Sequence, residues 1–240
     1  MYEPRIYRDR IPEDGLCSFR VMMGESDLWI RADEDLSSEA LSALREARRQ
    51  IAGYIRRDPA FLKSLIPHPV QEDAPPLVRK MAEAGEKAGV GPMAAVAGAI
   101  AEYVGGRLSR LSGEVIVENG GDVFLSIARP RKVGIWAGNS SLSGKVALEV
   151  TPEETPLAVC TSSGTVGHSL SFGKADAAVA MAESGPLADA VATALGNRVQ
   201  KPEDIRRGME WAMGIKGVRG VLVIVGDRMG ALGIVRLARA

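Results

Sequence analysis

The chain has 240 residues, of which 46% are hydrophobic and 25% charged, so it can bury a core and has an ordinary globular composition. Thirty basic residues balance thirty acidic ones and aromatic residues make up only 5%, which argues against a nucleic-acid-binding or membrane-surface protein. The two cysteines, Cys17 and Cys160, fit no metal or redox spacing, and the charged N-terminus lacks the apolar stretch of a signal peptide. We therefore expect a cytoplasmic protein with no membrane segment.

The first 90 residues predict strands followed by helices. Apolar and polar residues alternate in the strand manner, GESD supplies a turn, and Gly89 is a natural helix stop. The predicted elements are strands at 5–10 and 16–32 with the turn at 24–27, helices at 37–58, 59–66 and 76–90, and a proline-rich connector at 67–76.

The remaining residues begin with a small-residue helix and continue with short strands separated by Gly, Pro and Ser turns. The predicted elements are a helix at 91–111, strands at 114–118, 122–128, 132–138, 145–150 and 157–160, helices at 184–197 and 202–214, and a β-hairpin at 220–237. This order predicts an α+β fold with a largely antiparallel, mixed sheet flanked by helices. We expect one domain over 1–240, with the connector as the best candidate for a boundary.

Several familiar signatures are absent or imperfect. The stretch GNSSLSGKV at 138–146 resembles a phosphate-binding loop, but five residues separate its glycines and Val146 replaces the magnesium-binding Ser/Thr. No G-x-G-x-x-G follows a strand, and no G-x-S-x-G occurs. A histidine-rich metal site is improbable because the chain has two histidines, and His68 lies between prolines as a surface-loop residue would.

Two loops that follow strands carry small polar residues. In VENGGDVFL, Gly120 and Gly121 would let a ligand approach the backbone, with Asn119 and Asp122 beside them, although Asn-Gly by itself favours a tight hairpin turn. In AVCTSSGTVGHS, the backbone of 161–164 could hold an anion and His168 could act as a general base, or the segment is a flexible turn.

The alanine-rich helix at 184–197 carries a carboxylate, Asp189, and a hydroxyl, Thr193, four residues apart on one face. Both supply hard oxygen ligands of the kind that Mg²⁺ prefers. Alternatively, Asp189 complements the dipole at the start of its own helix and Thr193 bonds back to the carbonyl of residue 189.

The order of the segments GPMAAVAGAIAEYV, VENGGDVFL, LAVCTSSG, GHS and ADAVATALGN resembles the ApbE superfamily, the flavin transferases that attach FMN from FAD to a protein threonine. The resemblance spans roughly residues 88–200. We therefore expect residues 88–240 to form the motif-bearing core and residues 1–87 to form an N-terminal part that the resemblance does not cover. It implies an ApbE-like fold, Mg²⁺ and FAD as substrate or ligand, and an acceptor protein that the sequence does not identify. Within this superfamily, the chain resembles a smaller, uncharacterised branch more than it resembles the transferases themselves.

The resemblance also implies roles for individual residues. Asp189 and Thr193 match the side chains that hold magnesium beside the FAD pyrophosphate, and His168 matches the histidine that activates the acceptor. The residues that match cofactor-binding positions are Gly98, Glu102, Asn119, Gly120, Gly121, Asp122, Thr161, Ser162, Ser163 and Gly164.

The chain departs from the family pattern at three places. Glu102 stands in place of an aspartate, and Ile100 in place of an alanine whose carbonyl helps to bind the metal. The run HSLSFGK at 168–174 lacks the Asp, Pro and Thr that the family has there, which places the acceptor chemistry in question.

These features leave three hypotheses. The first is a Mg²⁺-dependent flavin-nucleotide protein that binds FAD and passes FMN to a protein hydroxyl or water. The second is a non-enzymatic flavin or nucleotide carrier or sensor, and the third is a different small-molecule reaction on the same scaffold. A nucleophilic Cys160 assisted by His168 is a weaker alternative, because Cys160 lies in an apolar strand. The oligomeric state stays open, a homo-oligomer included.

Overall fold

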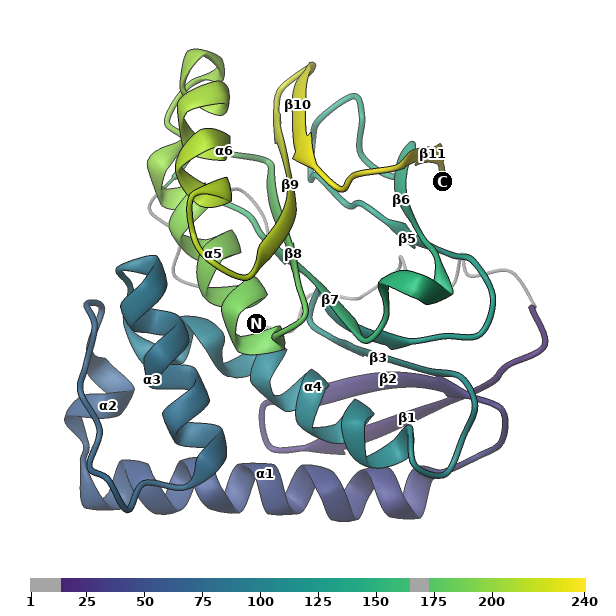
Figure 1. Ribbon diagram of the computed structural model, residues 1–240, viewed down its shortest axis with the longest axis vertical. Helices are drawn as coiled ribbons and strands as arrows, with labels where there is room; N and C mark the ends of the chain where they lie inside the picture. The colour runs from purple at the N-terminus through teal and green to yellow at the C-terminus, as the bar shows by residue number, and fades with distance from the viewer. Residues whose placement is uncertain (1–13, 165–172) are drawn as a thin grey trace.

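The computed structural model describes residues 14–164 and 173–240, so the strand predicted at 5–10 and the histidine His168 lie outside the described residues. An eight-stranded sheet with the order β1-β2-β3-β4-β7-β8-β9-β10 forms the centre of the molecule (Figure 1). Its strands are β1 (Cys17–Met23), β2 (Ser26–Ala32), β3 (Val115–Asn119), β4 (Asp122–Ser126), β7 (Leu157–Ser162), β8 (Ala177–Ala182), β9 (Val218–Val225) and β10 (Arg228–Gly233). All neighbouring pairs in the described part are antiparallel, which confirms the predicted α+β class.

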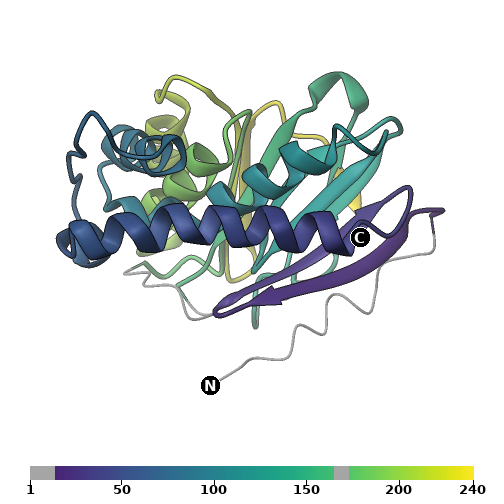
Figure 2. The ribbon, with the colours of Figure 1, turned by 90° about the horizontal axis from the view of Figure 1, so that it is seen from below.

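Helices cover one face of this sheet (Figures 1 and 2). They are α1 (Ser37–Arg57), α2 (Ala60–Lys63), α3 (Pro76–Ala88), α4 (Val96–Leu108), α5 (Gly185–Arg198) and α6 (Ile205–Met213), with short 3-10 turns η2 (Pro92–Ala95) and η4 (Pro202–Asp204). A third 3-10 turn, η3 (Pro152–Glu154), precedes β7 and lies away from these helices (Figure 1). The predicted stop of α3 is confirmed, because Gly89 follows the helix in the left-handed conformation with φ 72°. The helix predicted at 91–111 is divided into η2 and α4.

The other face of the sheet is covered by a small sheet with the order β11-β6-β5, built from β5 (Arg131–Gly134), β6 (Val146–Val150) and β11 (Leu237–Arg239). Leu148 and Val150 of the small sheet pack with Val159 and Leu222 of the large one. The hairpin predicted at 220–237 is correct only as far as Gly233, where φ is 88° and the chain turns toward the small sheet.

The sequence gives no sign of β8, which lies near the middle of the large sheet. All six residues of this strand, AAVAMA, are buried. Because both faces of the sheet are covered at this point, the strand lacks the alternation of apolar and polar residues by which half-buried strands are found. Alanine also has low strand propensity, and small side chains here allow α5 to lie close to the sheet.

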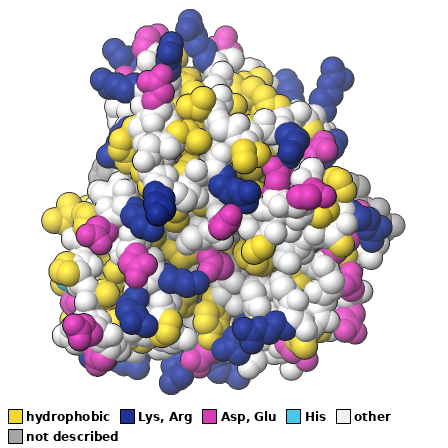
Figure 3. All heavy atoms as spheres, viewed as in Figure 1, with side chains coloured by type: hydrophobic (Ala, Val, Ile, Leu, Met, Phe, Trp, Pro, Cys, Tyr) yellow, Lys and Arg dark blue, Asp and Glu magenta, His cyan; other side chains and the backbone are white. Residues whose placement is uncertain are grey.

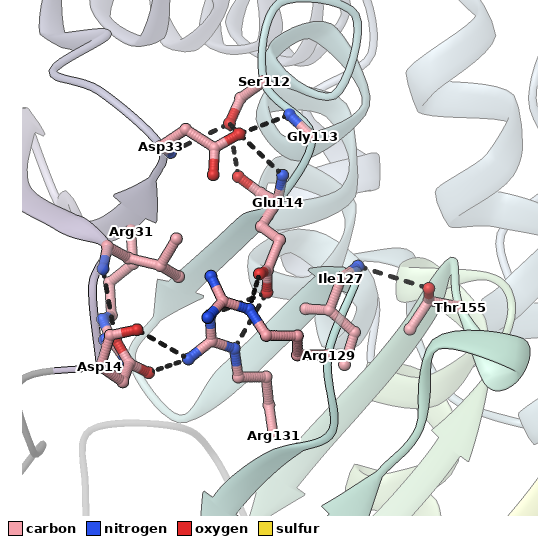
Figure 4. A network of polar contacts seen from close by, with 11 residues as sticks. Asp14, Arg31, Asp33, Ser112, Gly113, Glu114, Ile127, Arg129, Arg131 and Thr155 are labelled. Carbon is pink, nitrogen blue, oxygen red and sulfur yellow. Dashed lines mark hydrogen bonds and ion pairs between the residues drawn. The ribbon is translucent and has the colours of Figure 1, made fainter.

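A buried ionic network lies where β2 ends and β3 begins (Figure 4). The carboxylate of Asp14 pairs with both Arg31 and Arg131. The carboxylate of Glu114, 3% exposed, lies 2.9 Å from Arg131 Nη2 and 3.1 Å from Arg129 Nε. Each buried charge in this network thus has a partner of opposite sign, which buried ions require.

Basic and acidic side chains alternate over the face shown in Figure 3, with no extended area of one sign. No single helix within 14–164 and 173–240 is long and apolar enough to cross a membrane. Taken together, Pro76–Ala88 and Pro92–Leu108 pass that test by length and composition, but they are bent by 106° at the break between them.

We expect Glu114→Gln to lower the free energy of unfolding by about 3 kcal/mol, because it leaves Arg131 buried with less opposing charge. Glu86→Gln, at an exposed position of α3, is the matched control and should cost less than about 0.5 kcal/mol. Urea unfolding of the two variants measures both values. Equal effects would show that the network adds nothing to stability.

Candidate functional site

Four segments far apart in the sequence meet where β3 ends, β4 begins and β7 ends. The sheet supplies the turn between β3 and β4 and the last residues of β7, and the helical layer supplies the starts of α4 and α5. Most of the residues predicted to form a site lie in these segments. The structure therefore brings together predicted residues from 98 to 189, which the contacts below connect.

The segment Asn119–Asp122 is a two-residue hairpin turn, as Asn-Gly favours, because Asn119 pairs with Asp122 and the glycines have φ values of 70° and 105°. The two polar side chains that flank the turn point into the protein. Asn119 Nδ2 donates to the carbonyl of Ala97 at 3.0 Å, and Asp122 Oδ1 accepts from the amide of Thr161 at 3.2 Å. The turn is thereby fixed to α4 on one side and to β7 on the other.

Helices α4 and α5 cross in close contact at Gly98 and Gly185. A Cβ atom on Gly98 would lie 2.3 Å from the carbonyl oxygen of Gly185, and a Cβ on Gly185 would lie 2.4 Å from that of Gly98. Neither distance is compatible with a side chain, so glycine is required at both positions. The close crossing explains the small-residue character of both helices.

The crossing produces two reciprocal hydrogen bonds. The amide of Gly98 donates to Asp189 Oδ2 at 2.9 Å, and the amide of Gly185 donates to Glu102 Oε2 at 2.6 Å. Each carboxylate lies four residues after the contact glycine of its own helix, so it projects on the face that meets the other helix. We call this arrangement, Gly98 and Glu102 on α4 with Gly185 and Asp189 on α5, the reciprocal clamp.

The two carboxylates of the reciprocal clamp differ in charge balance. Glu102 Oε1 lies 2.7 Å from Lys80 Nζ, whereas no basic side chain of the described residues pairs with Asp189. Removal of solvent raises the pKa of Asp189 to about 7, and the amides of Gly98 and Ala97 oppose this rise by hydrogen bonding to the charged form. Asp189 is therefore a buried ionisable group that no cation from the described residues balances.

Asp122 and Cys160 lie beside Asp189 in the interior. Burial, and then the negative charge of Asp189, raise the pKa of Asp122 well above its usual range. Burial likewise raises the pKa of the Cys160 thiol, whose residue is fully buried in β7. The expectation that Cys160 belongs to the core is confirmed, and its raised pKa disfavours it as a nucleophile.

The remaining predicted residues lie in β7, directly after it, or further along α5. Ser162 is 6% exposed, and its hydroxyl has no hydrogen-bond partner within the described chain. Thr193 is half-buried one turn beyond Asp189, and the expected bond back to residue 189 is not among the hydrogen bonds of the described residues. Ser163 is half-buried, and Gly164 packs against Gly173, whose carbonyl oxygen would lie 2.0 Å from an added Cβ.

The sequence interpretation missed Lys80, which neutralises Glu102, and the pairing of the two helices through Gly98 and Gly185. A signal for the pairing exists, because glycine precedes an acidic residue by four positions in both GAIAE and GPLAD. The rejection of 138–146 as a phosphate-binding loop is supported, since β6 rather than a helix follows it. His68 is not isolated, because its Nε2 lies 2.7 Å from Asp58 Oδ2.

A family model described as AbpE bacteria matches residues 8–214 of the chain. A UPF0280 protein of Methanocaldococcus jannaschii is 40% identical over 220 residues, which cover 89% of each chain. A UPF0280 protein of Methanothermobacter thermautotrophicus is 43% identical over 223 residues, which cover 89% of this chain and 84% of that protein.

Solved structures of two flavin transferases share the fold. The flavin transferase ApbE from Vibrio cholerae superposes with a TM-score of 0.60 at 14% identity, covering 91% of this chain and 96% of that one. The apo form of the flavinyl transferase ApbE of Pseudomonas stutzeri gives a TM-score of 0.59 at 13% identity, covering 91% and 94%.

We expect Gly98→Ala to destabilise the protein by about 1–3 kcal/mol, because the added methyl group forces α4 and α5 apart. Gly106→Ala is the control on the same helix. Its Cβ would meet no atom within 4 Å, so it should stabilise the protein by up to about 1 kcal/mol. Thermal or urea unfolding tests the pair, and a neutral Gly98→Ala would contradict the close crossing.

Proposed function

Because the chain belongs to the family described as AbpE bacteria and is a member of the ApbE-like superfamily, we propose that it binds the flavin nucleotide FAD together with Mg²⁺. The site for both is the one around Asp189. We further propose that the bound FAD is cleaved at its pyrophosphate, with FMN passing to a protein hydroxyl or to water. The fold that the chain shares with flavin transferases supports the choice of ligand.

The observation that carries this proposal is the unequal charge balance of the reciprocal clamp. Glu102 and Asp189 make equivalent hydrogen bonds across the crossing, but within 14–164 and 173–240 a basic side chain, Lys80, pairs with Glu102 and none pairs with Asp189. At Asp189 the corresponding positive charge would come from Mg²⁺. The carboxylate is already held by amides at the start of α4, so it is oriented before any cation binds.

The residues present fit Mg²⁺ better than a metal that needs a closed set of protein ligands. Within 14–164 and 173–240, no group of three or more His, Cys, Asp or Glu side chains gathers in a way that could hold a metal ion. Mg²⁺ commonly takes one or two protein groups and completes its shell with water and substrate phosphates. Asp189 and Thr193 are the two side chains that would hold it, and the Thr193 hydroxyl has no competing bond within the described chain.

We propose that a cation also assists the approach of a pyrophosphate to this place. Burial, and then the negative charges of Asp189 and Glu118, raise the pKa of Asp122, so acidic groups gather here. The same negative charges would repel an anionic ligand. When bound, Mg²⁺ would neutralise this charge and polarise the phosphate oxygens.

Other residues of the chain have supporting roles in the proposal. The turn at Gly120 and Gly121 presents a backbone without side chains, and the buried hydroxyl of Ser162 is available to a ligand group. Asn119 and Asp122 keep the turn in place. We propose His168 as the group that assists the attacking hydroxyl, on the resemblance to the transferases alone.

We expect Asp189→Asn to weaken Mg²⁺-dependent FAD binding by at least about tenfold, because the substitution keeps the acceptor for Gly98 but removes the charge. Calorimetric titration of the full chain with FAD, with and without Mg²⁺, measures this loss, and AMP release is followed in the same samples. Thr193→Ser should bind as the wild type does, and Thr193→Val should bind more weakly.

Two results would redirect the proposal. Binding of FAD without AMP release would identify a flavin carrier in place of a transferase. If the wild type binds FAD equally well in the presence of a chelator, and Asp189→Asn does too, Asp189 is not a metal ligand.

The metal-free protein should lose stability as the pH rises from about 4 to 7. An acid whose pKa is higher in the folded state than in the unfolded state binds its proton more tightly when folded, so folding becomes less favourable as that proton is lost. Asp189→Asn should flatten this dependence and be the more stable protein at pH 8. Urea unfolding across this pH range tests the sign, and an unchanged slope in the variant would contradict it.

A further inference from the structure

We propose that Glu102 and Lys80 are positioning residues for the cation site, with Glu102 fixing the start of α5 and hence the place of Asp189. This inference rests on the proposed function, since it concerns the same site. It gives Glu102 a role in which the side chain contacts the protein and not the ligand.

The reason lies in the kind of contact that α4 and α5 make. Two glycines at a helix crossing allow a close approach, but they provide no side chains that interlock and resist rotation or sliding. Directional interactions at this point therefore add to the packing of the two helices in fixing the register of α5 on α4. The hydrogen bonds from Gly185 to Glu102 and from Gly98 to Asp189 hold α5 at two points one helical turn apart.

Only one of these two bonds can be purely structural. Asp189 accepts a hydrogen bond from Gly98 and, in the proposed function, also binds the cation. A cation that withdraws electron density from this carboxylate weakens the hydrogen bond to Gly98. Glu102 is free of that conflict because its two oxygens are occupied by Gly185 and Lys80. Glu102 thus keeps α5 in register whether or not a cation is present.

Lys80 secures this arrangement from α3. Its ammonium group donates a hydrogen bond to Glu102 Oε1, whereas the other oxygen, Oε2, accepts one from the amide of Gly185. The positive charge of Lys80 balances the negative charge of Glu102, which makes Glu102 a poor competitor for Mg²⁺. The chain thereby directs the cation to Asp189, the clamp carboxylate that has no basic partner among the described residues.

Two substitutions at position 102 separate positioning from simple charge. Glu102→Gln keeps the length of the side chain and an acceptor for Gly185 but removes the charge. Glu102→Asp keeps the charge but withdraws the acceptor by one methylene. Positioning predicts that Glu102→Gln retains cation affinity and Glu102→Asp loses it, whereas an effect of charge through space predicts the reverse order.

The experiment is a titration of the full chain with Mn²⁺ alone, followed by electron paramagnetic resonance, with Mg²⁺ as competitor. We expect Glu102→Gln to bind within about twofold of the wild type and Glu102→Asp to bind about fivefold or more weakly, the effect of one lost hydrogen bond. Lys80→Met should fall between them. The controls are Glu86→Gln and Lys87→Met, which change the same charges at exposed positions of α3.

A second measurement, made without metal, keeps the test independent of the proposed function. Hydrogen exchange of the Gly98 and Gly185 amides reports the two bonds of the clamp directly. We expect Glu102→Asp to speed exchange at both amides and Glu102→Gln to leave both protected. Failure of the wild type to bind Mn²⁺, with this exchange pattern intact, would refute the cation site but not the positioning role. Unchanged exchange at Gly98 in Glu102→Asp, or the reverse order of affinities, would overturn the positioning role itself.

Discussion

The backbone contact between Gly98 and Gly185 is the constraint on which the candidate site depends. It brings the start of α4 within hydrogen-bonding distance of a carboxylate on α5, and the start of α5 within reach of one on α4. One interpretation of the sequence was that Asp189 complements the dipole of its own helix. In the structure, Asp189 instead complements the dipole of α4. Any side chain at either glycine would separate the helices and remove both bonds at once.

Local patterns in the sequence predicted much of the fold. Turn residues placed the β1–β2, β3–β4 and β9–β10 hairpins correctly, and Gly89 marked the end of α3, because these features depend on residues close together in the chain. The strand β8 was missed because its burial on both faces comes from elements far away in the sequence. The order of the polar segments located the candidate site, but the partners of Glu102 and Asp189 are set by how the helices cross, which no local pattern encodes.

Buried carboxylates are paired with basic side chains at one end of the sheet and are not so paired, within the described residues, at the other. At one end, Glu114 and Asp14 are balanced by arginines (Figure 4), and the ion pairs to Arg131 join the segments before β1 and β3 to β5 of the small sheet. At the other end, Asp122 and Asp189 lie together without a basic partner among the described residues, and each has a raised pKa. A chain that neutralises buried carboxylates in one place has the means to do so in the other. Their different treatment is what a ligand-dependent site predicts, because there the balancing charge arrives with the ligand.

Burial of Asp189 without a basic partner among the described residues carries a cost in stability, since a buried carboxylate is unfavourable unless it is paired. The amides of Gly98 and Ala97 reduce this cost without removing the charge, and so hold the carboxylate in a state that a cation can use. Lys80 and Glu102 stabilise the same crossing without being part of the ligand's charge balance. In the proposed function, Glu102 is balanced by Lys80 and Asp189 is left for the cation, so the helices would keep one arrangement before and after binding. The site is then oriented in advance, and a ligand need not supply the free energy to assemble it.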